Sequence, residues 1–160
     1  MCELPDPAYR CRHCFEEVDE IGGLCLTCRK KRCLSVPRAY VFDPESPARL
    51  LGIEEEEAMA GFALLQWIQL EWPMPNAIVP MPDSIPIASA FARFLDLPLI
   101  QALSKQCEYQ EERLEEDQII LLFDISNSLP NLQKAALSLS ASFPKRVFLL
   151  SLLPDVDVDF

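Results

Sequence analysis

Two closely spaced pairs of cysteines near the N-terminus constrain the fold of this chain more than any other feature of its sequence. They are Cys11-Arg-His-Cys14 and Cys25-Leu-Thr-Cys28, and ten residues separate them. Two residues between cysteines allow both thiolates of a tight turn to reach one ion, and two such turns complete a tetrahedron around Zn²⁺. The spacing therefore predicts a zinc site formed by Cys11, Cys14, Cys25 and Cys28.

The predicted zinc site is structural, because four thiolates fill the coordination sphere and leave no position for water. A segment this short has little hydrophobic core, so the metal would stabilise its fold directly. An iron–sulfur site or a redox-active dithiol is the alternative. Cys2, Cys33 and His13 are candidate substitute ligands, but we expect two free thiols and an exposed imidazole. The pattern assigns no role to Cys107.

The seven cysteines must be interpreted together with the compartment of the protein. The N-terminal stretch lacks the apolar segment of a signal peptide. The apolar stretches near 58–70 and 146–153 are too short or too often interrupted to span a bilayer. We therefore expect a cytoplasmic protein without a membrane span, whose cysteines serve as thiols or metal ligands rather than as disulfides.

The charge of the chain is acidic and unevenly distributed. The net charge is −11, yet residues 1–38 hold seven basic and six acidic side chains. The acidic remainder is a poor platform for nucleic acid and opposes a polyphosphate substrate unless Mg²⁺ compensates. The one dense basic run is Arg29, Lys30, Lys31 and Arg32. It predicts either a solvated turn or a contact patch for single-stranded DNA or an acidic partner.

After residue 36, strand-like and helix-like segments alternate along the chain. Short apolar runs predict strands over 38–42, 77–80, 119–123 and 146–153. Helical spacing of apolar residues predicts helices over 47–72, 84–96 and 131–142. Residues 97–100 are expected to form a link or a short strand, and the acidic segment 104–118 a surface helix or a loop. This alternation predicts an α/β fold with a mainly parallel sheet.

Composition divides the chain into three parts. Residues 1–36 contain six of the seven cysteines and are predicted to form a zinc-ribbon module. Residues 37–153 are predicted to form the α/β domain. Residues 154–160 are predicted to be a loose acidic tail.

Taken in order, these features resemble the competence-associated ComF family. The resemblance covers roughly residues 8–153. It rests on the paired C-x-x-C, on Ile78-Val-Pro-Met-Pro82, and on the strand, loop and helix that begin at Leu121-Leu-Phe-Asp124. It implies a zinc ribbon followed by a reduced type I phosphoribosyltransferase-like domain. It also implies an association with DNA uptake and, for many members, a phosphoribosyltransferase activity.

The loop after the 119–123 strand departs from the family pattern, in which two acids and a Thr-Thr-Gly-x-Thr run hold phosphoribosyl pyrophosphate. Asp124 matches the first acid, but Ile125 replaces the second, Leu129 a threonine and Pro130 the glycine. Proline has no N–H and a fixed φ, whereas a phosphate cradle needs consecutive N–H donors. Because serine caps helices and proline suits a first turn, the segment favours a capped helix start.

Two hypotheses about function follow from this loop. The first is a non-catalytic interaction or scaffold protein with protein partners, in which Asp124, Ser126, Asn127 and Ser128 are a vestigial phosphoribosyl loop. The alternative is a divergent phosphoribosyltransferase or nucleotide-binding enzyme that uses these residues with Mg²⁺. The first hypothesis requires zinc as its cofactor, and Mg²⁺ is needed only by the alternative.

Overall fold

The apolar run that precedes Asp124 forms β3 (Ile119–Asp124), one of two central strands in a four-stranded sheet of order β1-β4-β3-β2. All three strand pairings are parallel. The computed structural model describes residues 4–18, 24–25, 36–43, 55–126 and 128–153. Its elements in chain order are η1 (Pro7–Tyr9), β1 (Arg38–Tyr40), α2 (Glu56–Leu70), β2 (Ala77–Pro80), α3 (Ile85–Leu95), β3, α4 (Leu129–Leu139), η3 (Ser140–Ser142) and β4 (Arg146–Ser151).

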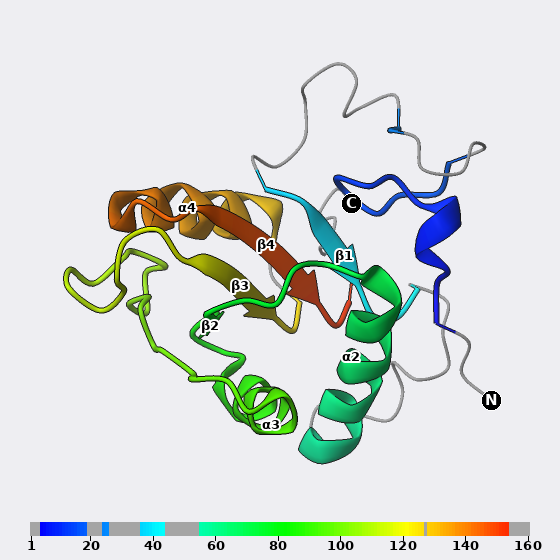
Figure 1. The fold of residues 1–160 in the computed structure, drawn as a ribbon, viewed down its shortest axis with the longest axis horizontal. Helices are drawn as coiled ribbons and strands as arrows, with labels where there is room; N and C mark the ends of the chain where they lie inside the picture. The colour runs from blue at the N-terminus through cyan, green and yellow to red at the C-terminus, as the bar shows by residue number, and fades with distance from the viewer. Residues whose placement is uncertain (1–3, 19–23, 26–35, 44–54, 127, 154–160) are drawn as a thin grey trace.

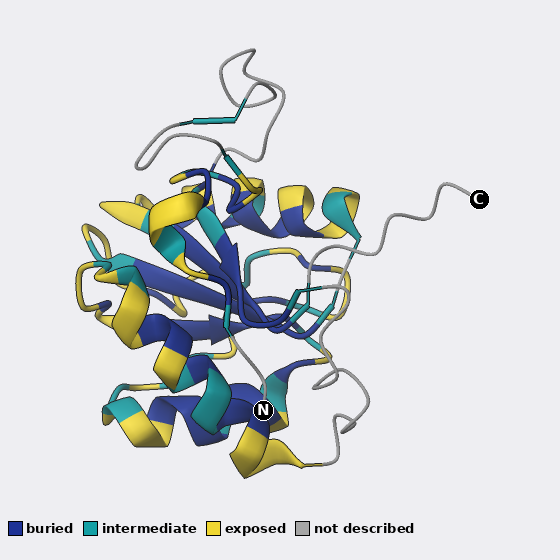
Figure 2. Cartoon of the chain, turned by 90° about the vertical axis from the view of Figure 1, so that its right-hand side faces the viewer, coloured by how far each residue is buried: buried dark blue, intermediate teal, exposed yellow. Residues whose placement is uncertain are grey.

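The sheet lies between two helical layers, with α2 and α3 on one face and α4 on the other (Figure 1). Successive side chains of a strand point to opposite faces. Leu121 and Phe123 accordingly pack with α2 and α3, whereas Ile120 and Leu122 pack with α4. Because both faces are covered, β3 is apolar from Ile119 to Phe123 instead of alternating. Figure 2 shows the burial that results along the strands, with exposed residues on the outer sides of the helices.

The segment that follows α3 covers the outer edge of β2. Ile78 donates its N–H to the Pro98 carbonyl at 3.0 Å, and its own carbonyl accepts from the Ile100 N–H at 2.9 Å. Leu99 thereby forms an isolated parallel bridge to Ile78. The link expected over 97–100 therefore protects an edge that would otherwise offer unpaired backbone groups to other chains.

The predicted elements are present with shifted ends. The helix predicted over 47–72 is observed as α2, and residues 47–54 lie outside the described part of the chain. The helix predicted over 131–142 begins earlier, at Leu129, and its last turn is the 3₁₀ helix η3. The last strand ends at Ser151, before the predicted end at 153. The predicted acidic tail, 154–160, lies outside the described residues, and the boundary at residue 36 stays a prediction.

The segment 104–118 is a loop, which is one of the two structures expected for it. Ser104 Oγ accepts from the Gln106 and Glu108 N–H groups, and this local bonding competes with helix formation. Cys107, Glu112 and Asp117 have positive φ values of 62°, 67° and 59°. A helix cannot pass through residues in that conformation. Repulsion between the neighbouring glutamates also disfavours a helix here.

The N-terminal segment packs directly against the outer edge of β1. The Arg38 N–H donates to the His13 carbonyl. Gln66 of α2, which is fully buried, donates to the carbonyls of Tyr40 at 3.0 Å and Pro5 at 3.2 Å. One side chain therefore joins the N-terminal segment, the edge strand and a helix.

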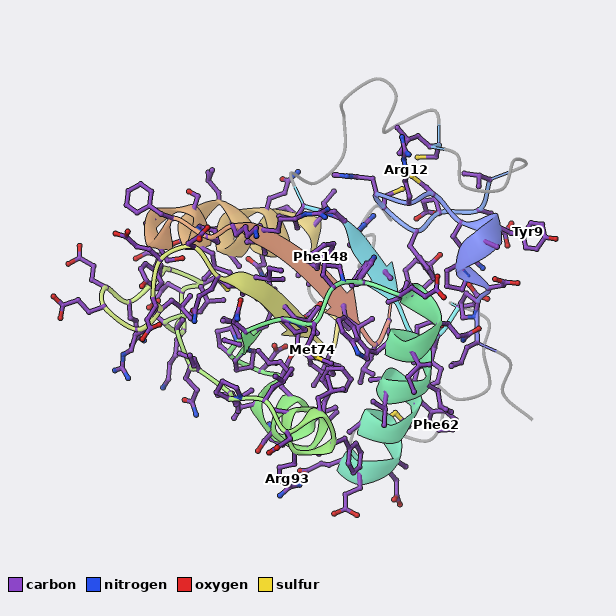
Figure 3. The ribbon with its side chains drawn as sticks, viewed as in Figure 1. Tyr9, Arg12, Phe62, Met74, Arg93 and Phe148 are labelled. Carbon is purple, nitrogen blue, oxygen red and sulfur yellow. The ribbon has the colours of Figure 1, made fainter. Side chains whose placement is uncertain are left out.

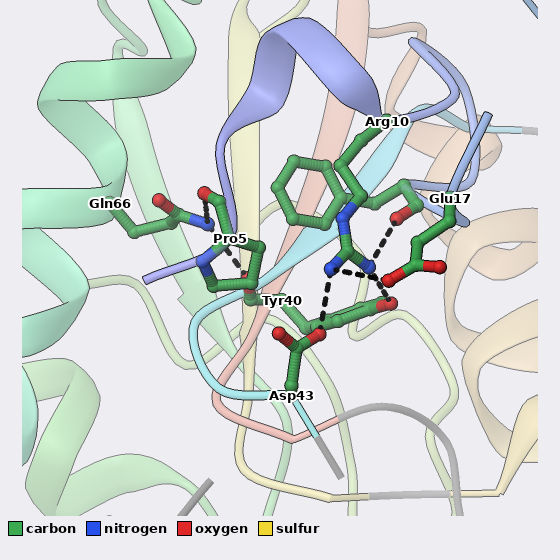
Figure 4. A network of polar contacts seen from close by, with 7 residues as sticks. Pro5, Arg10, Glu17, Tyr40, Asp43 and Gln66 are labelled. Carbon is green, nitrogen blue, oxygen red and sulfur yellow. Dashed lines mark hydrogen bonds and ion pairs between the residues drawn. The ribbon is translucent and has the colours of Figure 1, made fainter. Parts of the chain in front are cut away.

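Arg10 is the charged centre of this contact (Figure 4). Its side chain is 8% exposed, and its guanidinium donates to Tyr40 Oη at 2.7 Å and to Asp43 Oδ1 at 2.9 Å. The guanidinium carbon lies 5.6 Å from the ring centroids of Phe15 and Tyr40. Burial, reinforced by the Glu16 carboxylate, raises the pKa of Tyr40 to about 12, so the phenol stays neutral and can accept this bond.

Replacing Arg10 with methionine should lower the free energy of unfolding by about 2 kcal/mol. Hydrogen bonds to charged groups contribute about 1.5–3 kcal/mol each, but the Asp43 side chain is 39% exposed and would regain water. Urea unfolding followed by the fluorescence of Trp67 and Trp72 measures the change. Arg93→Met is the matched control, because Arg93 is exposed on α3 (Figure 3). Equal effects of the two substitutions would contradict the assignment.

Candidate metal centre

A short antiparallel hairpin holds the first cysteine pair at its tip. The Val18 N–H donates to the Tyr9 carbonyl at 3.1 Å, and the Cys11 N–H donates to the Glu16 carbonyl at 2.7 Å. Within the tip, the Phe15 N–H donates to the Cys11 carbonyl at 2.9 Å. These bonds turn the chain so tightly that the Cys11 and Cys14 side chains lie on the same side of the turn.

Phe15 leaves this turn in a left-handed conformation, with φ 70°. A bulky residue adopts that conformation only where its surroundings compensate. Here the phenyl ring is 3% exposed and packs edge-on against Tyr40, with the ring centroids 5.1 Å apart. The same backbone reversal therefore forms the cysteine turn and inserts Phe15 into the core of the sheet domain.

Three cysteine sulfurs converge beside this turn. The Sγ atoms of Cys11, Cys14 and Cys25 all lie within 4.8 Å of one another, and those of Cys14 and Cys25 are 3.4 Å apart. None of the three forms a disulfide with another described cysteine. Tetrahedral zinc with Zn–S bonds of about 2.3 Å separates its sulfur ligands by about 3.8 Å, so the observed spacing fits one shared ion. The cluster could therefore hold a metal such as zinc.

The backbone around Cys11 favours its thiolate, which is the form that binds metal. Burial opposes ionisation, but hydrogen bonds from the backbone at Cys14, Cys25 and His13 outweigh it. Together they bring the pKa of Cys11 to about 6. The His13 N–H, for example, donates to Cys11 Sγ at 3.4 Å. His13 is half-buried, not exposed as expected, and it contributes its backbone to both the cysteine cluster and the β1 edge.

The structure tests only part of the predicted cysteine and basic sites. Cys28, Cys2, Cys33 and the basic run 29–32 lie outside the described residues. Cys107 is 7% exposed, and burial raises its pKa, which describes an unreactive buried thiol.

A second group of polar residues lies at the carboxyl ends of β2, β3 and β4. Asp124, which is 1% exposed, accepts from Ser151 Oγ at 3.2 Å. The Ile125 N–H donates to Ser84 Oγ at 2.9 Å, and the Ile125 side chain packs into the core at 6% exposure. The sequence pattern points to Asp124 but not to Ser84 or Ser151, because no local pattern marks serines that meet across strand ends.

The loop after Asp124 ends in a capped helix, as the sequence predicts. Ser128 has the extended conformation of an N-cap residue, and its Oγ accepts from the Asn131 N–H at 3.5 Å. The Leu132 N–H donates to the Ser128 carbonyl at 3.1 Å. Pro130 lies in the first turn, where its missing N–H has no cost. Asn127 lies outside the described residues.

None of the described helices combines the length and apolar character needed to span a lipid bilayer. Comparison of the chain with protein-family models, with curated proteins and with solved structures gives no match. What the structure establishes is an α/β protein with a four-stranded parallel sheet and an N-terminal cluster of three cysteines.

The purified, reduced protein should contain about one equivalent of zinc per chain, because three converging thiols are matched to a single ion. Cys11→Ser should lower the zinc content by more than half, whereas Cys107→Ser should leave it unchanged. Metal analysis after gel filtration measures both. Equal zinc contents in the two variants would contradict the assignment.

The stability of the metal-free, reduced protein should depend on pH through Cys11. A thiol whose pKa falls from 9.0 to about 6 on folding stabilises the folded state fully above pH 9. That stabilisation declines as the pH falls and is absent below about pH 6. Urea unfolding of the wild type and Cys11→Ser across pH 6–9 should show a difference that grows with pH. A constant difference would contradict the thiolate at Cys11.

Proposed function

We propose that this chain is a non-catalytic protein of the ComF type that acts as an interaction scaffold. In this proposal the N-terminal segment is a zinc ribbon in which Cys28 joins Cys11, Cys14 and Cys25 as the fourth ligand. The α/β domain is a reduced phosphoribosyltransferase-like domain that no longer transfers phosphoribosyl groups. The metal stabilises the fold and takes no part in a reaction.

The observation that carries this proposal is that N–H groups of the loop after β3 are hydrogen-bonded within the protein. The Ile125 N–H, which a phosphate cradle would direct at its ligand, is bonded to Ser84 Oγ instead. Asp124 accepts from Ser151 and is 1% exposed, so it is withdrawn from solvent. The Asn131 and Leu132 N–H groups are used by the helix cap. These three N–H groups are thus bonded within the protein, where a substrate would need donors.

The free energy of binding a phosphoribosyl substrate also supports loss of activity. A bound 5-phosphate gains about 1.5–3 kcal/mol from each charge-assisted hydrogen bond, and Pro130 cannot supply one. Mg²⁺ requires exposed carboxylate oxygens, usually together with waters and substrate phosphates. The burial of Asp124 opposes such an arrangement, and so does the negative field of an acidic domain.

The resemblance to the ComF family extends the proposal to cellular context. We place the protein in a reducing cytoplasm, among the proteins associated with DNA uptake. Protein partners fit its acidic surface better than nucleic acid does, because phosphate contacts require basic groups. Contact of Arg29, Lys30, Lys31 and Arg32 with single-stranded DNA stays a prediction.

Calorimetric titration with phosphoribosyl pyrophosphate and Mg²⁺ tests the proposal. The wild type should give no binding heat at micromolar to millimolar concentrations of the compound. Asp124→Asn should behave in the same way, as should Asp83→Asn, a matched control for an exposed acid after a neighbouring strand. Micromolar binding that Asp124→Asn abolishes and Asp83→Asn retains would overturn the proposal in favour of an active enzyme.

A further inference from the structure

Helix α2 carries apolar residues on two opposite sides. One side is buried against the sheet and α3 and includes Met59, Ala60, Ala63 and Trp67. The opposite side carries Ala58, Gly61, Leu65 and Ile68, which we call the outer stripe. Leu65 is 54% exposed and Ile68 is 62% exposed. A surface helix usually has one apolar side, so this helix has an apolar side that the described residues leave uncovered.

The spacing of the outer stripe places its four members in one row. Steps of three, four and three residues keep side chains on the same side of a helix. Ala58 and Gly61 are small, and a Cβ atom added at Gly61 would meet no atom within 4 Å. A glycine in an exposed helix interior costs about 1 kcal/mol relative to alanine. The stripe thus has small residues at one end and large ones at the other. The backbone of a partner could approach the small end closely.

Acidic residues bound both ends of the outer stripe, and the stripe itself has no charged residue. Glu55, Glu56 and Glu57 are exposed before it, and Glu71 is exposed after it. Among the described residues, no ion pair involves these glutamates. Glu71 also lies at the C-terminus of α2, where the helix dipole favours a cation, and the last turn contains no basic residue. Both ends are therefore complementary to positive charge.

We propose that the outer stripe is a docking surface for an amphipathic segment of another protein, with an apolar face bounded at both ends by Lys or Arg. This inference rests on the proposed scaffold function and specifies the chemistry of the partner. Apolar contact along the helix would supply affinity, and the terminal charges would fix the position of the segment.

A second copy of this chain fits the stripe less well. An antiparallel pair of α2 helices about a two-fold axis places Glu71 of one copy near Glu55 to Glu57 of the other. A parallel pair places each acidic end beside its equivalent. Either arrangement brings like charges together, in addition to the repulsion between two chains of net charge −11. The charge pattern therefore favours a different, basic partner.

The direct test is the binding of a designed peptide measured by fluorescence anisotropy. The probe is a labelled amphipathic helix with a Leu/Ile face and two lysines at each end, and the matched peptide has glutamates in place of those lysines. The lysine peptide should bind the wild type at least tenfold more tightly than the glutamate peptide. Raising the salt concentration should weaken its binding, because the terminal charges are exposed.

Variants of the protein locate the binding surface. Leu65→Ser with Ile68→Ser should weaken binding of the lysine peptide at least tenfold, and both sites are exposed enough for the fold to be retained. Leu137→Ser is the matched control, because Leu137 is an exposed leucine on α4 and its replacement should change nothing. Glu56→Gln with Glu57→Gln should weaken binding and reduce its salt dependence.

Three results would overturn the inference. The first is no binding of the lysine peptide, and the second is equal binding by the wild type and the Leu65→Ser, Ile68→Ser variant. The third is self-association in sedimentation velocity that this variant abolishes, which would assign the stripe to a second copy. Titration with phosphoribosyl pyrophosphate tests the proposed function at the loop after β3, whereas the peptide tests the outer stripe on α2. Failure of one can therefore be told from failure of the other.

Discussion

Arg10 joins the cysteine hairpin to the edge of the sheet through buried hydrogen bonds to both parts. The residue lies next to Cys11, donates to Tyr40 of β1 and to Asp43, and lies beside the ring of Phe15. A buried guanidinium is costly unless its donors are satisfied. The hairpin, β1 and the chain after β1 must therefore all be in place before this charge can be buried. Folding of the N-terminal segment is thus coupled to folding of the sheet.

Because of this coupling, a metal ion bound by the cysteine cluster would affect more than the hairpin. The turn that brings Cys11 and Cys14 together is also the turn that inserts Phe15 into the core. An ion that stabilises the turn would stabilise the Phe15 and Arg10 contacts, and through Gln66 the position of α2. The helix that carries the outer stripe is accordingly linked to the hairpin through buried polar contacts. Such rigidity would suit the scaffold function that we propose, because a preorganised surface loses less entropy on binding.

Much of this structure follows from local sequence patterns. The C-x-x-C spacing predicted the convergence of Cys11, Cys14 and Cys25, and the apolar runs predicted the strands, because a parallel sheet covered on both faces needs such runs. Ser128 and Pro130 predicted the helix start, since capping depends on neighbouring residues alone. The sequence did not reveal the role of Arg10 or of Ser84. Each acts on residues 30 or more positions away, where no spacing rule applies. The sequence also did not decide between a helix and a loop for 104–118. That choice depends on positive φ values at single residues, which charge patterns do not specify.

The coupling of the metal site to the sheet can be measured most directly by amide hydrogen exchange. The Arg38 N–H donates to His13 of the hairpin, whereas the Val41 N–H donates to Ser151 of β4 within the sheet. Removing zinc with a chelator should accelerate exchange at Arg38 strongly and at Val41 less, because opening of the hairpin exposes the first bond before the second. Unchanged exchange at Arg38 after zinc removal would contradict the coupling.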